Sequence, residues 1–318
     1  MDNRRINFSI VIPYYNIIEG LKRLLPGISV YDDVQVIVVD DRSDTAVEEY
    51  TRVKKEYQER GVLFLENDGV KGAGSCRNLG MKYAIGKWIL FGDADDYFTE
   101  GFHSILLGYT DSCADLIYFN PTSVFADTLE PADRHKSYEK IIRTYLADPC
   151  HENELHLRYN FPSPCSKMFL REYLVDHSLQ FEEIMYSNDN AFSTASAFYA
   201  SSIEVSDKTI YCITDREGSL TKNIDMGANL IRLQAWIRRC SFLKKKLSAK
   251  DWKYLNINAM GRLIDIFQQG ADIKTLLGLV WECACAGIPF IDMSRVNRKT
   301  FLKTFSRLYR SNKTNRCR

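Results

Sequence analysis

The stretch WILFGDADDYF, from Trp88 to Phe98, places three aspartates within four positions directly after a short apolar run. The run is too short for an ordinary helix and has the continuous apolar character of a strand buried on both faces. Carboxylates crowded in this way repel one another, so a nearby cation would offset the cost of holding them together. The stretch therefore predicts a buried strand that delivers acidic side chains to one edge of a sheet.

Similar apolar runs occur before and after this stretch, and helical patterns separate them. The expected strands are FSIVIPYY (8–15), VQVIVVDD (34–41), GVLFLEN (61–67), KWILFGD (87–93) and DLIYFN (115–120). Strands that alternate with helices form right-handed βαβ units and a parallel sheet. We therefore predict an α/β fold with a Rossmann-like, doubly wound, mainly parallel sheet.

The second half of the chain changes from this alternation to helices. After two short expected strands at 202–206 and 209–213, the pattern from about residue 225 onward is helical throughout. We expect one domain over residues 1–222 and a helical C-terminal region over 223–318. Residues 295–318 hold nine Lys or Arg and no acid, and their apolar residues share one helical face. This basic amphipathic terminal helix suits either a membrane surface or packing on the domain.

Composition excludes some classes of function. The net charge of +1 gives no overall field for nucleic acid. No run approaches the roughly 20 apolar residues of a membrane span, and no signal-peptide pattern precedes the first strand. The nine cysteines are scattered without a CxxC pair, so we expect reduced thiols in a cytosol.

Polar residues follow each of the first four expected strands. Taken singly, such residues are common in turns and at helix N-termini. In an open α/β sheet, however, the carboxyl ends of the strands form the ligand-binding edge. Several carboxylates at one edge suit a hard cation, Mg²⁺ or Mn²⁺, whose coordination shell a diphosphate can complete. The glycine-rich segment NDGVKGAGSCRNLG (67–80) matches neither a P-loop nor GxGxxG, but its Lys71 and Arg77 can face an anion at a helix N-terminus.

Four segments together carry a family resemblance. SIVIPYYN, VIVVDDRSDT, GAGSCRNLGMKYAIGKWILFGDADD and SKMFLREYLVDHSLQFEEIMYSNDNAF resemble the successive signatures of family 2 glycosyltransferases with the GT-A fold. The resemblance covers residues 8–221 and implies that residues 1–222 form a nucleotide-sugar-binding and catalytic domain. It implies inverting transfer of one hexosyl or N-acetylhexosaminyl group, by default from a UDP-sugar, to a hydroxyl of a glycan or lipid-linked acceptor.

The resemblance also implies a biological setting and residue roles. The setting is bacterial surface polysaccharide synthesis (capsule, O-antigen or lipooligosaccharide) in the cytoplasm, with peripheral contact to the inner face of the membrane through 295–318 as one expectation. Asp189 matches the catalytic base, with Glu182 and Glu183 as fallback candidates. The DxD pair, Asp93 and Asp95, would bind Mn²⁺ or Mg²⁺, and Asp96 would cap a turn or support the pair. The donor-binding set, with Lys71 added from its position near an anion, is Pro13, Tyr14, Asn16, Asp40, Asp41, Lys71, Arg77, Asn78, Asp93 and Arg216.

Some features depart from the family pattern, and other functions remain open. Asn188 stands where the family commonly has Glu before the base, which removes a neighbouring negative charge and should lower the pKa of that base. The QxxRW segment of processive synthases is absent, which favours addition of a single sugar. The alternatives are a metal-dependent nucleotidyltransferase, a non-catalytic nucleotide-sugar-binding protein and a glycoside hydrolase, which also pairs two carboxylates.

Overall fold

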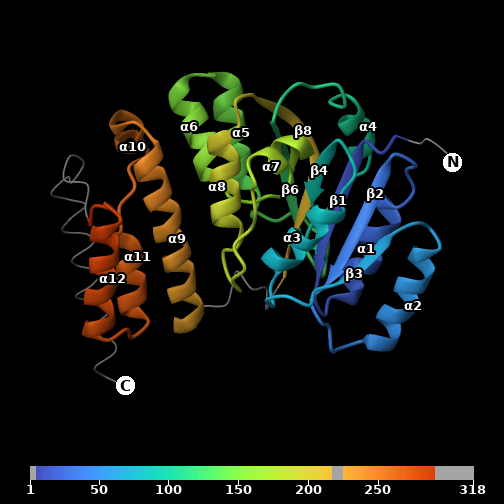
Figure 1. Cartoon of the computed structure of the whole chain (residues 1–318), viewed down its shortest axis with the longest axis horizontal. Coiled ribbons are helices and arrows are strands. Elements are labelled where there is room, and N and C mark those ends of the chain that lie inside the picture. Colours follow the sequence, from blue (N-terminus) through green and yellow to red (C-terminus); the bar gives the residue numbers. More distant parts are fainter. Residues whose placement is uncertain (1–4, 217–224, 291–318) are drawn as a thin grey trace. The chain divides into compact units, whose positions relative to one another are not determined.

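The computed structural model describes residues 5–216 and 225–290. The chain divides into two compact units, Met1–Lys222 and Asn223–Arg318 (Figure 1). The expected basic helix at 295–318 lies outside the described residues. Among the described helices, none combines the length and the apolar character needed to cross a membrane.

The first unit is built on one sheet of eight strands in the order β3-β2-β1-β4-β7-β6-β8-β5. The strands are β1 (Phe8–Tyr14), β2 (Val34–Asp40), β3 (Leu63–Glu66), β4 (Trp88–Phe91), β5 (Tyr97–Phe98), β6 (Leu116–Phe125), β7 (Lys167–Leu170) and β8 (Ile203–Asp215). β3, β2, β1 and β4 pair in parallel, and β6 pairs in parallel with β8, whereas β7 and β5 run antiparallel to their neighbours. The predicted α/β class with a mainly parallel sheet is confirmed.

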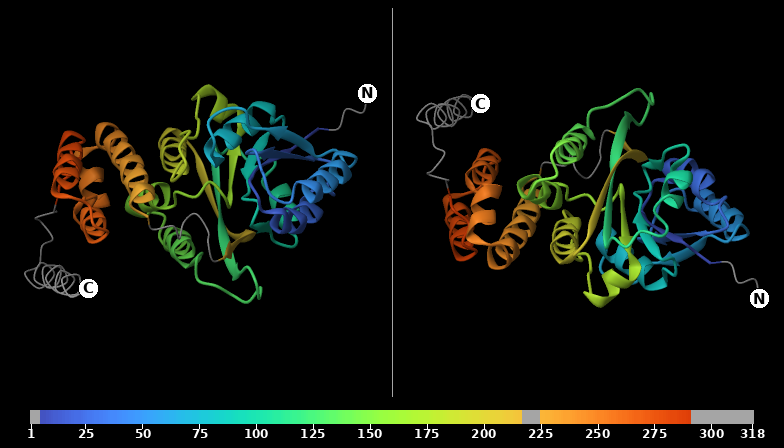
Figure 2. Two further views of the ribbon diagram at one scale, coloured as in Figure 1. Left: turned by 90° about the horizontal axis from the view of Figure 1, so that it is seen from below. Right: turned by 90° about the horizontal axis from the view of Figure 1, so that it is seen from above.

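Helices connect and cover these strands. Their bounds are α1 (Ile18–Ile28), α2 (Val47–Gln58), α3 (Ala73–Tyr83), α4 (Phe102–Leu107), α5 (Lys136–Ala147), α6 (His151–Asn160), α7 (Arg171–Asp176) and α8 (Asp189–Tyr199). The chain steps outward from β1 through α1 to β2 and through α2 to β3, and then returns through α3 to β4 on the other side of β1. Right-handed crossovers therefore put α3 on the opposite face from α1 and α2 (Figure 2).

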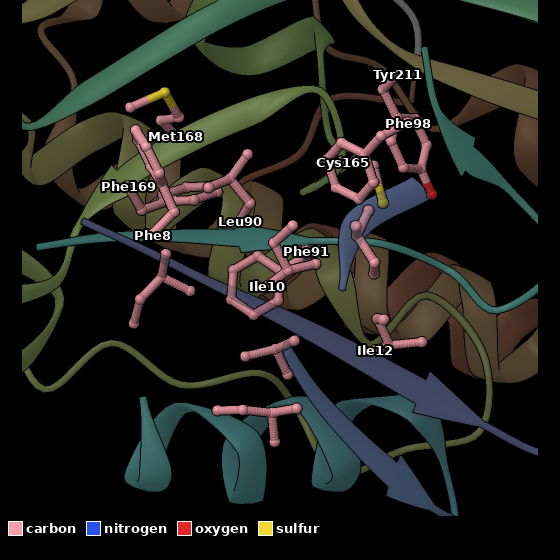
Figure 3. Packing of buried hydrophobic residues seen from close by; sticks show 14 of the residues in the cluster. Phe8, Ile10, Ile12, Leu90, Phe91, Phe98, Cys165, Met168, Phe169 and Tyr211 are labelled. Atoms are coloured by element: carbon pink, nitrogen blue, oxygen red, sulfur yellow. The ribbon is translucent and has the colours of Figure 1, made fainter. Parts of the chain in front are cut away.

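The core of this unit explains why the apolar runs form strands. All seven residues of β1 are buried, and so are all four residues of β4. Figure 3 shows the aromatic part of this core, where Phe91 and Phe169 lie among branched aliphatic side chains. Strands covered on both faces need apolar residues at every position rather than at alternate ones. This requirement is why the continuous apolar runs, and not alternating ones, marked the sheet.

The structure differs from the expected elements in three places. The sequence over 165–176 predicts helix and loop, whereas residues 167–170 form β7, which pairs with both β4 and β6. The two short strands expected at 202–213 are one strand, β8, with register irregularities opposite Asn120. A proline in a helix interior normally ends or kinks the helix, so Pro26 predicts an end or kink there. It instead lies inside α1, which continues to Ile28.

The second unit is helical over its described part. Its helices are α9 (Met226–Lys246), α10 (Ala249–Leu255), α11 (Met260–Gln268) and α12 (Ile273–Cys285). Local sequence sets three of their starts, because Asp225, Ser248 and Asp272 each accept a hydrogen bond from a backbone N–H of the first turn. Leu233 and Trp236 of α9 and Leu263 of α11 are among the buried side chains that hold the unit together.

Candidate active site

The candidate site lies at the carboxyl ends of β1, β2, β3 and β4. The chain leaves β1 toward β2 on one side and returns to β4 on the other, so the order of the strands reverses at β1. In open α/β sheets such a switch point opens a crevice for a ligand outside the strand ends. The residues that follow these four strands are the ones that the sequence marked as polar.

The three aspartates after β4 have different surroundings. Asp96 is buried; the Tyr211 hydroxyl donates to its Oδ2 at 2.9 Å, and the Thr214 N–H donates to its Oδ1 at 2.7 Å. Burial, followed by repulsion from Asp95 and Asp93, raises the pKa of Asp96 well above its usual range. Asp96 therefore ties the loop after β4 to β8, as the supporting role predicted for it requires.

Asp93 and Asp95 are more accessible, and each pairs with an arginine. Arg77 Nη2 lies 2.5 Å from Asp93 Oδ1, and Arg216 Nε lies 3.0 Å from Asp95 Oδ2. The side chains of Asp93 and Asp95 are 41% and 23% exposed. The structure thus places Arg216, a predicted donor-binding residue, directly against one of the predicted metal ligands.

The donor set of this pair fits a loosely held divalent cation. Carboxylate oxygens are the ligands that Mg²⁺ and Mn²⁺ prefer, and each carboxylate uses only one oxygen in its ion pair with an arginine. Among the described residues, no group of three or more His, Cys, Asp or Glu side chains could enclose a metal. The pair therefore suits an ion whose coordination shell is completed by a bound diphosphate, and does not suit a closed protein site.

Arg77 connects the acidic loop to a distant segment of the chain. Its Nη1 donates to Asn188 Oδ1 at 2.8 Å while its Nη2 holds Asp93, and the guanidinium carbon lies 5.2 Å from the centre of the Phe181 ring. Burial by itself lowers the pKa of Arg77, but Asp93 and its other negative neighbours outweigh that and raise it. The arginine is therefore a fixed cation between the end of β4 and the start of α8.

Asp189 is the first residue of α8 and lies half-buried beside this cation. Burial is the largest influence and raises the pKa of its carboxyl, although Arg77 and Lys167 act in the opposite direction. Because Asn188 is neutral where the family commonly has Glu, one influence that would raise the pKa of Asp189 is missing. Burial nevertheless raises this pKa above its ordinary value. The fallback candidate Glu183 is exposed. The backbone carbonyl oxygen of Glu182, the other fallback candidate, lies against Gly74.

On the other side of the switch point, the predicted nucleoside-binding residues hold one another in place. Asp40 Oδ1 accepts from the Ser43 N–H and hydroxyl, and Asp41 Oδ1 accepts from Asn67 Nδ2 at 2.7 Å. The backbone of Asn16 is in the left-handed region, with φ of 54°. Its side-chain oxygen accepts from the N–H groups of both Asp44 and Thr45.

Other predicted donor-binding residues lie deeper or farther out. Tyr14 is buried and its ring stacks on Tyr50, with the ring centres 4.8 Å apart. Both ends of the Asn78 amide bond the backbone of Phe181, at 3.0 and 2.8 Å. These contacts favour positioning roles for Tyr14 and Asn78, and Pro13 belongs to the buried strand β1. Lys71 lies outermost, with its Nζ 4.0 Å from the centre of the exposed Tyr15 ring.

Sequence reasoning missed two residues around the site, Tyr211 and Lys167. The Tyr211 hydroxyl accepts from the Asp93 N–H at 2.8 Å, and Cys165 lies near Phe98 and Tyr211 at one end of the core (Figure 3). Burial raises the pKa of the Cys165 thiol, so this cysteine remains a neutral packing group. Lys167 is only 1% exposed, and its Nζ donates to the Phe161 carbonyl at 2.6 Å. No local pattern in SPCSKMFL indicates that this lysine is buried.

Comparison with known proteins agrees with this geometry. A family model described as Glycosyl transferase family 2 matches residues 9–177. The putative glycosyltransferase EpsH of Bacillus subtilis is 25% identical over 217 residues, which are 64% of this chain and 59% of that protein. TarS of Staphylococcus aureus, a poly(ribitol-phosphate) β-N-acetylglucosaminyltransferase, is 26% identical over 230 residues, which are 67% of this chain and 36% of TarS. The chain thus spans less than two thirds of each of these relatives.

Solved structures show a similar fold. The structure of TarS residues 1–349 with UDP-GlcNAc has a TM-score of 0.63 and 19% identity, covering 88% of this chain and 80% of that one. The mannosyltransferase PcManGT of Pyrobaculum calidifontis, in complex with GDP-Man and Mn²⁺, has a TM-score of 0.57 and 14% identity, covering 96% and 81%. At these low sequence identities the similarity shows that the fold is shared and shows no more than that.

Proposed function

The chain belongs to glycosyl transferase family 2, and from this premise we propose that it transfers one sugar, with inversion, from a UDP-sugar to an acceptor hydroxyl. The group transferred is a hexose or an N-acetylhexosamine. The acceptor is a glycan or lipid-linked glycan of a bacterial surface polymer, and the enzyme works in the cytoplasm at the inner face of the membrane. The names of EpsH and TarS support the glycosyltransferase reaction, and the UDP-GlcNAc complex of TarS supports the donor class.

One observation carries the proposal. The buried Arg77 bonds Asp93, at the end of β4, and Asn188, which directly precedes Asp189. A contact between residues 111 positions apart thereby brings the DxD pair and the candidate base to one site. Direct displacement needs both kinds of group, because one must remove a proton while the other end of the site binds the departing diphosphate.

Asp189 is the proposed general base. It accepts the proton of the acceptor hydroxyl while the hydroxyl oxygen bonds to the anomeric carbon and the bond from that carbon to the diphosphate oxygen breaks. A carboxyl whose pKa is raised binds a proton more strongly, which makes it a better base as long as it is ionised. Arg77 and Lys167 favour the ionised form, so the two cations keep a strengthened base available.

Asp93 and Asp95 are the proposed ligands of Mn²⁺ or Mg²⁺, an ion that would act as a Lewis acid toward the leaving diphosphate. In the described structure these carboxylates are paired with Arg77 and Arg216. Both arginines stand where they can also offset negative charge on a diphosphate, since guanidinium groups bind phosphate oxygens in pairs. We propose the same for Lys71, which lies outermost at the edge of the site beside Tyr15.

The nucleoside is proposed to bind beside the loop after β2. Asp40 and Asp41 end a buried strand there, and Asn16 fixes the following turn through three hydrogen bonds. A turn held in this way keeps its carboxylates and amide groups in place before the donor arrives. Such preorganisation reduces the entropy that binding would otherwise cost.

A donor panel tests the proposal. Nucleoside diphosphate release is measured with UDP-GlcNAc, other UDP-sugars and GDP-mannose, each with Mn²⁺, with Mg²⁺ and with EDTA. We expect turnover of one UDP-sugar that requires a divalent ion. A glycoside hydrolase would release sugar without a nucleotide donor, and a nucleotidyltransferase would release pyrophosphate from a nucleoside triphosphate.

Two variants and a control complete the test. Asp95→Asn should abolish the metal-dependent turnover, and Asp189→Asn should lower the transfer rate by roughly 10²–10⁴-fold while UDP-sugar binding persists in calorimetry. Asp176→Asn, an exposed acid on α7, controls for the loss of one charge. Full activity of Asp189→Asn would contradict the assignment of the base, and binding without turnover of any donor would favour a binding protein.

A further inference from the structure

The overall charge of +1 conceals a strong division between the two units. The first unit, Met1–Lys222, has 23 Lys or Arg against 35 Asp or Glu, a net charge of −12. The second unit, Asn223–Arg318, has 19 against 6, a net charge of +13. A charge asymmetry of this kind between parts of a chain indicates that the basic part meets an anionic partner.

The second unit also exposes one apolar helix face. Ile273, Leu277 and Trp281, spaced four residues apart on α12, are 73%, 64% and 71% exposed. Val280 lies beside them and is exposed as well, and we call these four residues the α12 face. Side chains three or four residues apart lie on the same side of a helix, so the α12 face is one continuous stripe.

The other side of α12 is already used. Leu279 and Cys283 are buried, and α12 packs against α11 within the unit. A helix that is apolar on nearly all sides is normally buried on all of them. Packing within this unit therefore buries one side of α12 and leaves the α12 face uncovered. An exposed apolar surface of this kind marks a site of contact with another apolar surface.

An anionic lipid surface matches both observations together. A polyanion in water, such as a nucleic acid or a phosphate polymer, would attract the positive charge but would leave the apolar stripe exposed. Helices that lie in the membrane interface combine an apolar face, often with Trp, with an excess of Lys and Arg. Attraction of basic residues to anionic headgroups then adds to the burial of the apolar side chains.

We propose that the second unit docks on anionic phospholipid membranes by inserting the α12 face into the interface, while the excess of Lys and Arg in that unit provides electrostatic attraction. The inference deepens the membrane location given in the proposed function, and it does not depend on the proposed reaction. It assigns the contact to described residues of α12 in addition to the basic segment 295–318.

Intrinsic fluorescence of the full chain gives a direct test. Trp88, Trp236 and Trp252 are buried, so Trp281 is the tryptophan whose surroundings change when the α12 face enters a membrane. We expect vesicles of phosphatidylcholine with about a third phosphatidylglycerol to shift the emission to shorter wavelength and to protect it from acrylamide. Unchanged emission at saturating binding would overturn the proposal, because binding would then bypass the α12 face.

Vesicle co-sedimentation tests the same surface by substitution. Leu277→Glu/Trp281→Glu should weaken binding to the anionic vesicles by about tenfold or more, since it puts two charges where two large apolar side chains insert. Val175→Glu, an exposed apolar position in the first unit, is the matched control and should bind like the unchanged chain. Circular dichroism and donor turnover establish that each variant folds, and they keep this test separate from that of the proposed function.

Two further outcomes would overturn the proposal. One is equal binding to pure phosphatidylcholine and to anionic vesicles, which would remove the role of charge. The other is a chain that self-associates in light scattering, becomes monomeric in the double variant and binds vesicles unchanged. In that case a second copy of the chain, and not a lipid, covers the α12 face.

Discussion

Lys167 offers a quantitative test of the site's electrostatics through the stability of the protein. The residue is 1% exposed, and its ammonium group donates to the Phe161 carbonyl and lies 4.5 and 4.9 Å from the centres of the Phe161 and Tyr118 rings. Burial is the largest influence and lowers the pKa of Lys167 to about 7, although Asp189 and Cys165 act against it. An unfolded chain would return this lysine to its ordinary pKa of 10.5.

The difference sets both the sign and the size of the effect. Between pH 7 and pH 10.5 the unfolded chain binds more protons at Lys167 than the folded chain, so the free energy of unfolding rises with pH in this window. Below pH 7 the lysine is charged in both states, and burying that charge costs about 5 kcal/mol, because each pKa unit corresponds to ~1.4 kcal/mol. From pH 7 to pH 9 the recovered stability is about 2 kcal/mol.

Replacing Lys167 with Met removes the titration while keeping a side chain of similar length. Urea unfolding of both proteins is followed by circular dichroism at several pH values from 6 to 9. We expect the variant to be more stable at pH 6 and 7, and the stability difference to shrink by about 2 kcal/mol on going to pH 9. The loss of the bond to the Phe161 carbonyl adds a constant that does not depend on pH.

Lys208→Met removes an exposed lysine from β8 and serves as the control for the loss of one charge. Its stability curve should run parallel to that of the unchanged chain. If the curve of Lys167→Met also ran parallel to it, Lys167 would not titrate near neutral pH. The inference that burial dominates the electrostatics around Asp189 would then be refuted for Lys167, one of the two buried cations that act on it.

Further predictions concern the carboxyl base and the close contacts around it. Asp189→Asn should lower the transfer rate by roughly 10²–10⁴-fold. The same variant should have a higher free energy of unfolding at neutral pH, because a carboxyl with a raised pKa destabilises the folded state once the pH is above the ordinary pKa. Rate assays check the first expectation and urea unfolding at pH 7 checks the second. A variant less stable than the unchanged chain would contradict the second. A Cβ at Gly20 would lie 2.3 Å from the Ala94 carbonyl oxygen, so Gly20→Ala should cost about 1–3 kcal/mol and reduce metal-dependent turnover, whereas Gly27→Ala in the same helix, with open space around it, should do neither. A Cβ at Gly74 would lie 2.2 Å from the Glu182 carbonyl oxygen. We expect Gly74→Ala to lower the transfer rate more than it lowers the affinity for the metal, which calorimetry measures. Equal losses of rate and of metal affinity would refute this.

Local sequence was sufficient to predict the sheet and the polar residues at its carboxyl edge. The strand that ends at Phe91 and the acids that follow it are adjacent in the chain, so one short stretch indicates both a strand and its polar end. The same holds for β2 and the pair Asp40 and Asp41. The crossover rule then places these ends at one edge without further information.

Contacts between distant segments were not predictable in the same way. β7 is only four residues long, and its pairing with β4 and β6 is decided by the sheet and not by its own sequence. The two hydrogen bonds that join the Asn78 amide to the backbone of Phe181, 103 residues away, are one such contact. A single sequence contains no periodic pattern that relates two such positions.

Burial was the other property that the sequence did not reveal, and it acts in opposite directions on two neighbours at the site. It raises the pKa of the Asp189 carboxyl and lowers the pKa of the Lys167 ammonium, because in both cases it disfavours the charged form. The two pKa values therefore move toward each other, while Arg77 keeps its charge through Asp93 and its other negative neighbours. Asp189 as a base must both accept and release a proton near neutral pH. Such surroundings favour this, because burial raises the proton affinity of Asp189 while Arg77 stays positively charged beside it. The stability that Lys167 costs the fold is in this way tied to the proton affinity of the candidate base.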